Sequence, residues 1–248
     1  MTSLRARLLG GDRAVGLFVQ TPHPVVAEVA GRLGPDVLCL DQEHAPFDIA
    51  AVHAVVGGAA LAGVPALVRV PANTAHHIAA ALDAGAAGVV VPRVESAGEA
   101  AAAAAFARYP PVGSRGLGPA RSTGYGRDIA AAVARAADET LVAVQVETRR
   151  GVEALDEILT VGEIDLVFVG PGDLAASTGL GGGALRDILD DVVTRTHAAG
   201  KAAGIYVADA DAAADWGRRG VELILFGSDL GFLSAGVEAA WLSLRGAT

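Results

Sequence analysis

The stretch LVAVQVETRRGVEALDEILTVGEIDLVFVGPGD, residues 141–173, decides the fold class. It contains two short apolar runs, 141–146 and 164–169, and polar residues or glycine follow each run directly. Both runs are almost continuously apolar, which is typical of strands that are covered on both faces. A longer segment separates them, so the pattern predicts two parallel strands joined by a right-handed helical crossover.

The same alternation runs through the whole chain. Longer segments with helical spacing, such as 23–34, 48–63 and 96–109, lie between short apolar runs. Eight such units in 248 residues match the usual size of a (β/α)₈ barrel, with a doubly wound open sheet as the runner-up. No linker or shift in composition interrupts the chain, so we expect one domain over residues 1–248. The eight apolar runs are 14–19, 36–40, 65–70, 87–91, 141–146, 164–169, 201–207 and 222–227.

Composition excludes several classes of function. The formal net charge is −9 and no basic run is present, which makes nucleic acid an unexpected partner. The single cysteine, Cys39, lies inside an apolar run and is expected to be a small core residue. The N-terminus lacks the apolar stretch of a signal peptide, and no segment approaches the roughly 20 apolar residues of a membrane span. We therefore expect a soluble cytoplasmic protein with no membrane partner.

Two segments interrupt the regular alternation. Residues 109–128 form a long Gly-, Pro- and Arg-rich insertion, and residues 177–183 form a glycine-rich segment after the sixth predicted strand. Long loops in compact barrels are usually functional or mobile, so the insertion is expected to be one or the other, and residues 177–183 are expected to be flexible.

Polar residues follow the predicted strands where a barrel of this kind carries its chemistry. Gln145 and Glu147 share one face of the fifth strand, because side chains alternate along a strand. Asp173 follows the sixth strand and is expected at the same mouth. Any one of these residues could instead cap a helix or face solvent. The other candidates at strand ends are Asp41, Glu43, His44, Arg69 and Arg93.

Two converging carboxylates, Glu147 and Asp173, would repel each other unless a cation lies between them. Oxygen ligands without a nearby Cys or His favour a hard divalent ion such as Mg²⁺ or Mn²⁺. The one lysine of the sequence, Lys201, precedes the seventh strand and is expected at the opposite rim. Schiff-base catalysis is therefore not expected. The glycines near residues 170 and 181 match neither a P-loop nor a dinucleotide fingerprint.

Six segments of the sequence resemble the HpcH/HpaI aldolase family, metal-dependent pyruvate aldolases that include 4-hydroxy-2-oxoheptanedioate aldolase and 2-keto-3-deoxy sugar-acid aldolases. The resemblance extends from about Gly16 to Leu233, and residues 177–187 depart from it by being shorter and richer in glycine. It implies a TIM barrel of the phosphoenolpyruvate/pyruvate superfamily type. The segments are DQEHAPFD (41–48), VRVP (68–71), VVVPRVESAGEA (89–100), ARYPPVGSRGLGPARS (107–122), VQVETRRGVEALDEIL (144–159) and DLVFVGPGDLAASTG (165–179).

The resemblance also implies roles for individual residues. Glu147 and Asp173 match the metal ligands, and Arg69 matches the arginine that contacts the pyruvate or enolate oxygen. His44 matches the catalytic base, with Asp41 as its carboxylate partner. Gln145 matches a glutamine beside the metal, and the backbone of Gly172 and Asp173 matches the turn that binds the substrate carboxylate.

The implied activity is that of a class II aldolase, which reversibly cleaves a 4-hydroxy-2-oxo acid to pyruvate and an aldehyde through the enolate of pyruvate. The expected cofactor is Mg²⁺, Mn²⁺ or Co²⁺, and the expected small-molecule partners are pyruvate, hydroxyaldehydes and 4-hydroxy-2-oxo acids. Three alternatives stay open: an oxaloacetate decarboxylase, a citrate-lyase-like acyl-CoA lyase, and a non-catalytic protein that binds pyruvate or a sugar acid.

The C-terminal segment 229–244 predicts an assembly. Leu233, Val237, Trp241 and Leu244 recur at helical spacing and form an apolar stripe. The stripe could pack on its own barrel. In the resembled family, however, the last helix reaches a neighbouring subunit and the assembly is commonly a hexamer, so we expect a homohexamer. The resemblance also implies that Asp83 contributes to a neighbour's active site, although it could equally be a helix-end residue.

Overall fold

A computed structural model describes residues 2–246, and its eight parallel strands close into one barrel in which β8 pairs back with β1. The predicted barrel is thereby confirmed, and the open-sheet alternative is wrong. Each strand lies within a few residues of its predicted bounds, and β5 matches them at both ends. The strands are β1 (Ala14–Val19), β2 (Val37–Asp41), β3 (Ala66–Arg69), β4 (Gly88–Val91), β5 (Leu141–Val146), β6 (Leu166–Val169), β7 (Ala202–Val207) and β8 (Leu223–Ser228).

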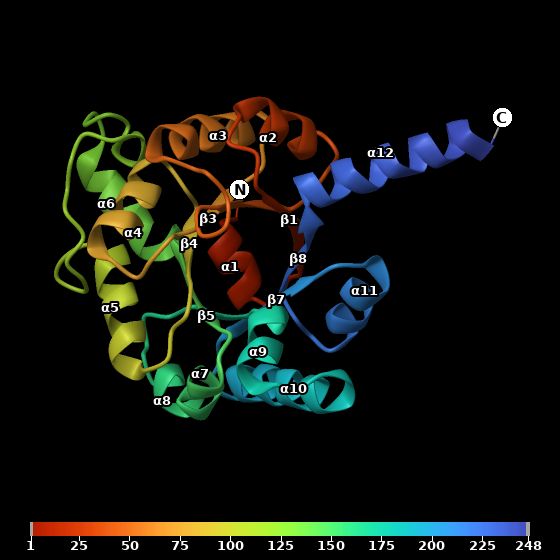
Figure 1. Ribbon diagram of the computed structural model, residues 1–248. Coiled ribbons are helices and arrows are strands. Elements are labelled where there is room, and N and C mark those ends of the chain that lie inside the picture. Colours follow the sequence, from red (N-terminus) through yellow and green to blue (C-terminus); the bar gives the residue numbers. More distant parts are fainter. Residues whose placement is uncertain (1, 247–248) are drawn as a thin grey trace.

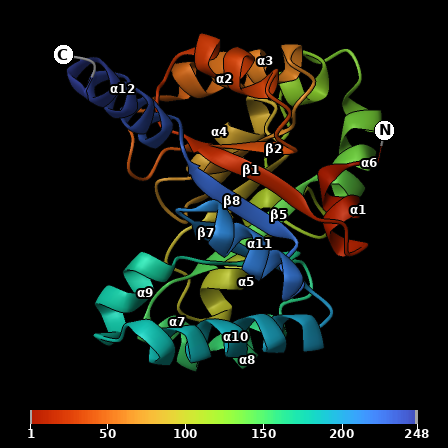
Figure 2. The same cartoon turned by 90° about the vertical axis from the view of Figure 1, so that its right-hand side faces the viewer.

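Helices surround the barrel as an outer layer (Figures 1 and 2). None of the helices that the structure describes is long and apolar enough to cross a membrane. The helices are α1 (Leu4–Leu9), α2 (Pro24–Gly31), α3 (Ile49–Leu61), α4 (Ala75–Asp83), α5 (Ala97–Ala107), the 3₁₀ helix η1 (Arg121–Thr123), α6 (Ile129–Glu139), α7 (Arg149–Glu153), α8 (Leu155–Leu159), α9 (Pro171–Thr178), α10 (Gly182–Ala198), α11 (Ala210–Arg218) and α12 (Asp229–Gly246).

Alternation along the strands divides the apolar side chains into two cores. On β5, Leu141 and Ala143 belong to the core inside the barrel, whereas Val142 and Val144 belong to the core under the helices. Leu4 and Leu8 of α1 also belong to the inner core. Cys39 is buried there as predicted, and burial raises the pKa of its thiol to about 12.

Two arginines anchor the insertion at residues 109–128. Arg121 donates to the backbone carbonyls of His53 and Ala84, and Arg115 donates to Asp83 of α4. The insertion is therefore a packed cover over α3 and α4.

The expectation of a flexible segment at residues 177–183 is wrong. Ser177 and Thr178 end α9, and α10 begins at Gly182, so the segment is a short turn between two helices. Gly179 takes φ +71° at the C-cap of α9, a conformation that glycine adopts without the steric cost of a Cβ. The glycines of this segment thus end one helix and begin the next.

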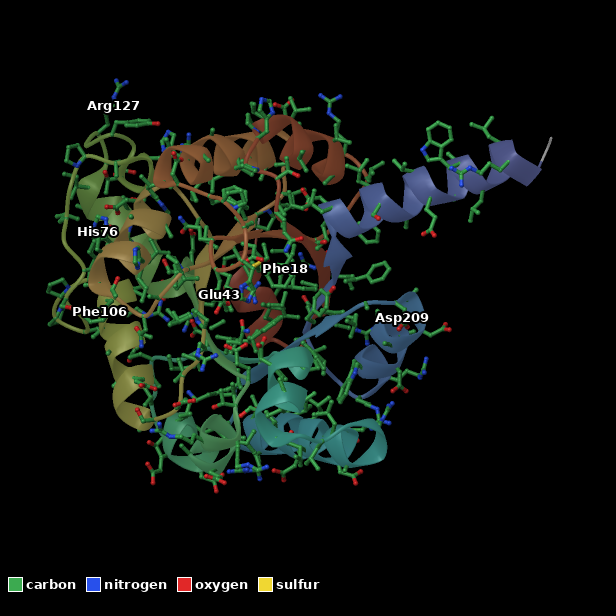
Figure 3. The ribbon with its side chains drawn as sticks, viewed as in Figure 1. Phe18, Glu43, His76, Phe106, Arg127 and Asp209 are labelled. Carbon is green, nitrogen blue, oxygen red and sulfur yellow. The ribbon has the colours of Figure 1, made fainter. Side chains whose placement is uncertain are left out.

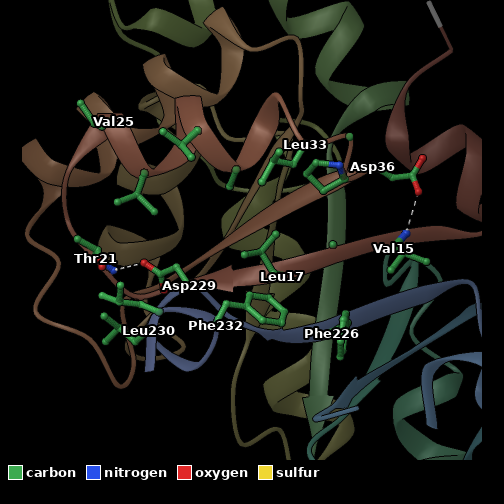
Figure 4. Close-up of a pocket in the computed structure, with 17 residues that line it drawn as sticks. Val15, Leu17, Thr21, Val25, Leu33, Asp36, Phe226, Asp229, Leu230 and Phe232 are labelled. Atoms are coloured by element: carbon green, nitrogen blue, oxygen red, sulfur yellow. Dashed lines mark hydrogen bonds between the residues drawn. The ribbon is translucent and has the colours of Figure 1, made fainter. Parts of the chain in front are cut away.

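Helix α12 leaves the barrel instead of covering it, and Figures 1 and 2 both show it projecting from the body. None of its described residues is buried. The predicted stripe stays open, with Leu233 63% and Trp241 57% exposed, so it does not pack on its own barrel. Where α12 departs, an apolar groove of about 690 Å³ runs between α2 and the base of α12, across the outer side of β1 (Figure 4).

Candidate active site

The alternation on β5 carries Gln145 and Glu147 to the mouth of the barrel. Leu141 and Ala143 face the interior, so Gln145 and Glu147 continue the same face past the end of the strand. Both are almost fully buried, at 1% and 2% exposure, and the Gln145 amide donates to Glu147. The Arg93 amide donates to the other Glu147 oxygen at 2.9 Å, from a backbone with φ +54°.

Asp173 lies in the first turn of α9, three residues beyond Gly170. The N-cap of α9 is Gly170 and it makes no side-chain cap, so Asp173 is not the capping residue. A Cβ at Gly170 would lie 2.7 Å from an oxygen of Glu147 and 3.1 Å from the amide nitrogen of Gln145. Glycine at this position therefore makes the space that the buried carboxylate occupies.

Asp41 and Arg69 form a bidentate ion pair across the ends of two adjacent strands, where they stand opposite each other in the register of β2 and β3. Arg69 donates from Nε to one oxygen of Asp41 at 3.0 Å and from Nη2 to the other at 2.8 Å. Burial by itself would raise the pKa of Asp41, but the hydrogen bonds and charge of Arg69 outweigh it and hold that pKa below its ordinary 3.8. The Arg69 guanidinium also lies 4.5 Å above the ring of Phe18.

The backbone after β2 turns around Asp41. One oxygen of Asp41 accepts the amides of Glu43 and His44, at 3.2 and 3.1 Å. The His44 ring is 57% exposed, and its Nε2 lies 3.8 Å from Glu43. Asp41 thus contacts the backbone of His44, and the carboxylate beside the imidazole is that of Glu43.

Of the two acids that could orient His44 from the sequence, Asp41 and Glu43, Glu43 is the one whose carboxylate lies near the ring. Its Oε2 lies 3.3 Å from Nη1 of Arg69 but has no partner with hydrogen-bond geometry, although it is buried. Burial raises the pKa of Glu43, and the charges of Asp41 and Asp173 add to this against the opposing charges of Arg69 and His44. The acid was visible in the sequence, but its position facing Arg69 was not.

The acidic set at this mouth fits a hard divalent cation. Burial raises the pKa of Glu147 above its ordinary 4.5, and repulsion from Glu43 and Asp173 raises it further. A divalent cation would relieve both effects, and the donors are all oxygens. The buried oxygen of Gln145 also has no hydrogen-bond partner. Among residues 2–246 no group of three or more His, Cys, Asp or Glu has the arrangement of a metal site, so Glu147 and Asp173 form a two-residue candidate.

A cavity of about 290 Å³ opens beside these groups. Arg69, Gln145 and the 170–173 turn line it. The lining also includes residues that the sequence analysis did not select, namely Phe18, Gln20, Phe168, Tyr206 and Ser228. Most of these stand at the ends of β1, β7 and β8, where the same strand-end rule could have found them. Phe18 and Glu43 lie near the middle of the ring of helices in Figure 3.

The cavity lining does not include Asp41, His44 or Glu147, and two further predicted positions lie elsewhere in the fold. Asp83 ends α4 and pairs with Arg115 at 2.6 Å; it does not line this cavity. Lys201 donates to the carbonyls of Val161 and Ile164, in the loop that leads into β6, so it lies at the opposite rim as expected.

Comparison with known proteins identifies the family to which the chain belongs. The family model described as HpcH/HpaI aldolase/citrate lyase matches residues 14–235. The chain is 37% identical to a hydroxypyruvate/pyruvate aldolase of Roseovarius nubinhibens, over 97% of this chain and 92% of that protein. It is also 37% identical to a 2-keto-3-deoxy-L-rhamnonate aldolase of Klebsiella pneumoniae, over 88% and 86%.

A solved structure agrees over the whole chain. The crystal structure of an HpcH/HpaI aldolase/citrate lyase family protein from Burkholderia cenocepacia superimposes with a TM-score of 0.92 at 34% identity, covering 99% of this chain and 100% of that one. The closed barrel and these matches agree, and the chain belongs to the HpcH/HpaI aldolase/citrate lyase family, as a carbon–carbon lyase of the aldolase class.

Proposed function

We propose that this protein is a class II pyruvate aldolase that reversibly cleaves a 4-hydroxy-2-oxo acid into pyruvate and an aldehyde. The observation that carries the proposal is the buried Glu147 beside Asp173, with the Asp41–Arg69 ion pair at the same barrel mouth. Glu147 and Asp173 would bind a cation, and Arg69 supplies a fixed positive charge. Both positive charges would stabilise the negative charge of the enolate. The names of the relatives agree with this reaction class.

Glu147 and Asp173 would hold Mg²⁺, Mn²⁺ or Co²⁺. The cation supplies Lewis acidity to the keto oxygen of pyruvate, which lowers the barrier by several kcal/mol. Arg69 binds the same oxygen as its negative charge develops, and Asp41 fixes the plane of the guanidinium. The free amides of Gly172 and Asp173 point out of the N-terminus of α9 and suit the substrate carboxylate.

His44 is the proposed base. Its ring is exposed after the end of β2, and the proposed reaction requires it to reach a substrate hydroxyl and accept its proton. Glu43 orients the ring from 3.8 Å away. In cleavage, His44 takes the proton of the 4-hydroxyl group as the carbon–carbon bond breaks. The electron pair of that bond passes to the pyruvate fragment as the enolate, which is then protonated to pyruvate.

The test is a cleavage assay on a panel of 4-hydroxy-2-oxo acids, with oxaloacetate included to detect a decarboxylase. Chelation should abolish aldol cleavage, and Mg²⁺, Mn²⁺ or Co²⁺ should restore it. Borohydride with pyruvate should trap no adduct, because Lys201 lies at the other end of the barrel. Full activity in the double variant Glu147→Gln, Asp173→Asn would overturn the assignment. Glu163→Gln, in the loop that precedes β6, is the control for loss of a carboxylate elsewhere.

The assembly is the second part of the proposal. The stripe on α12 is exposed, and the groove beside α2 is apolar and open, with Val29 57% and Leu33 83% exposed. A second copy of the chain is the proposed occupant, because each copy offers one such helix and one such groove. A homohexamer is the expected form, with Asp83 contributing to a neighbour's site, and the cytoplasm is the expected location; both expectations come from the sequence.

A further inference from the structure

Helix α12 begins with a carboxylate that serves a different element. The two oxygens of Asp229 accept the backbone amides of Gln20 at 2.8 Å and Thr21 at 3.0 Å, and Figure 4 shows the bond to Thr21. Ser228 accepts the Gly231 amide at 3.1 Å and so serves the first turn of α12 itself. Asp229 therefore holds the backbone where β1 ends and the loop to α2 begins.

The side chain of Gln20 continues from that loop into the active site. Its amide nitrogen donates to Asp41 at 3.2 Å, on the same oxygen that accepts Nη2 of Arg69. The other oxygen of Asp41 accepts Nε of Arg69 and two backbone amides. Gln20 and Arg69 are thus the two side chains of the described residues that donate to Asp41, and Gln20 is the one that is tied to α12.

We infer that Asp229 is a positioning residue for the reaction, acting through Gln20 and Asp41 on Arg69. Asp41 is fully buried and Arg69 is 8% exposed, so the orientation of one fixes the orientation of the other. The charge-assisted hydrogen bonds from two consecutive amides to Asp229 hold the backbone of Gln20 in the place from which its side chain reaches Asp41. The inference rests on the proposed function only in its kinetic readout.

The hydrogen bonds between Asp229 and Gln20, and between Gln20 and Asp41, give α12 a role beyond assembly. No described residue of the helix is fully buried, although the Phe232 ring packs against Phe226 of β8, and the Asp229 carboxylate is its hydrogen-bonded link to the site. A second copy that fixes the direction of α12 would also fix Asp229, and through it the guanidinium that binds substrate. Assembly and substrate affinity are coupled in this protein through Asp229.

The kinetic test uses Asp229→Ala and Gln20→Leu. Each should raise KM for pyruvate about 3- to 30-fold, the usual range for a residue that acts through a network, with a smaller change in kcat. The double variant should be no worse than the worse single variant, because both act on one path. Asp229→Asn keeps one acceptor oxygen and should fall between Asp229→Ala and the parent. Gln20→Leu leaves α12 intact and should keep the parent's sedimentation coefficient.

The matched control is Asp209→Ala. Asp209 caps α11 by accepting the Ala212 amide at 2.7 Å, at the same end of the barrel, and it makes no contact with this chain of residues. It lies at the periphery in Figure 3. Its loss should lower the thermal midpoint and leave KM unchanged. Equal KM values in Asp229→Ala and Asp209→Ala, or additive effects in the double variant, would reduce Asp229 to a structural tie and overturn the inference.

A readout without turnover separates this inference from the proposed reaction. The NMR resonance of Nε–H of Arg69 reports its bond to Asp41, and it should shift in Asp229→Ala but not in Asp209→Ala. A shifted resonance in a protein without aldolase activity would refute the reaction and keep the positioning chain. An unmoved resonance in an active aldolase would refute the positioning role of Asp229 and leave the proposed reaction in place.

Discussion

At the scale of single residues, two buried carboxylates organise the two ends of the barrel. Asp41 pairs with Arg69 at the mouth, and Asp165 pairs with Arg108 at 2.9 Å near the opposite end. Both acids are buried, at 0% and 3% exposure, and each also accepts backbone amides. Asp165 also pairs with Arg5 at 2.8 Å. Both acids are thus buried partners of arginine, but only Arg69 lines the cavity, so the two pairs can be compared.

Asp41→Asn should lower the free energy of unfolding by about 3 kcal/mol, because the buried Arg69 loses its bidentate counter-charge and keeps only Glu43, 3.3 Å from Nη1. It should also lower kcat/KM about 10- to 100-fold, since the guanidinium loses a charged partner. Asp165→Asn should give a similar stability loss, with the activity of the folded fraction unchanged. Chemical denaturation and steady-state kinetics check both, and equal catalytic losses in the two variants would contradict the proposed role of Asp41.

The pH dependence of stability follows from the same residue. The folded pKa of Asp41 lies below the ordinary 3.8, so the folded state holds the ionised form more strongly than the unfolded state does. This contribution to stability is fully present above pH of about 3.8 and is lost as the pH falls through the folded pKa. Unfolding free energies between pH 6 and 3 should therefore fall less steeply for Asp41→Asn than for the parent.

The contribution of Glu147 to the pH dependence of stability has the opposite sign. Its folded pKa is raised by burial, so its ionisation destabilises the fold increasingly as the pH rises from the ordinary 4.5 through the folded pKa. Metal-free Glu147→Gln should consequently be at least as stable as the parent at neutral pH. Added Mn²⁺ should raise the melting temperature of the parent and leave that of the variant unchanged. Thermal scans with and without Mn²⁺ test this, and an equal rise in both proteins would argue against Glu147 as a ligand.

At the scale of elements, the junction between β6 and α9 shapes the site. Gly170 is the N-cap of α9, and because it has no Cβ it leaves room for the carboxylate of Glu147 after the end of β5. The packing of this strand end against the start of α9 therefore depends on glycine at residue 170. The register of β5 against β6 brings the two elements side by side, with Gln145 opposite Phe168.

Gly170→Ala should displace Glu147, because the new Cβ would lie 2.7 Å from its oxygen. We expect weaker activation by Mn²⁺ and lower kcat/KM, measured by titrating the metal against activity. Gly162→Ala is the control, since a Cβ there meets no atom within 4 Å. Parent-like metal activation in Gly170→Ala would show that Glu147 can shift without consequence.

At the scale of the whole molecule, the exposed apolar stripe of α12 and the open apolar groove beside α2 indicate an interface. Large exposed apolar patches on soluble proteins usually mark interfaces, and Trp is enriched among the residues that anchor them. The groove also lies directly beside Asp229, so the proposed interface and the proposed positioning chain meet there (Figure 4).

Trp241→Glu on the helix and Leu33→Glu in the groove should each shift the protein to smaller species in sedimentation, with loss of activity. The two changes remove opposite sides of one contact, so either suffices. Leu61→Glu is the control: Leu61 is 83% exposed at the end of α3 and does not line the groove. If the parent sediments as a fully active monomer at micromolar concentration, the assembly proposal fails.

The sequence by itself predicted eight strands and their closure into a barrel, which the structure confirms, and it predicted the barrel mouth as the place of the candidate site. These follow from local signals: continuous apolar runs, the alternation that carries Gln145 and Glu147 to one face, and polar residues directly after strands. The family resemblance was also readable, because its motifs stand at those strand ends. The turn at residues 177–183 was misjudged because glycine also ends helices, as Gly179 does at the C-cap of α9.

Only the tertiary structure decided which side chains pair. Asp41 was expected as the carboxylate partner of the nearby His44, but its side-chain partners are Arg69 on the adjacent strand and Gln20. Closure of β8 onto β1 brings Asp229 to Gln20 across 209 residues of sequence, and it leaves α12 outside the barrel. No local pattern encodes such contacts, because partner choice depends on how the strands close and on which polar groups burial leaves in need of a bond.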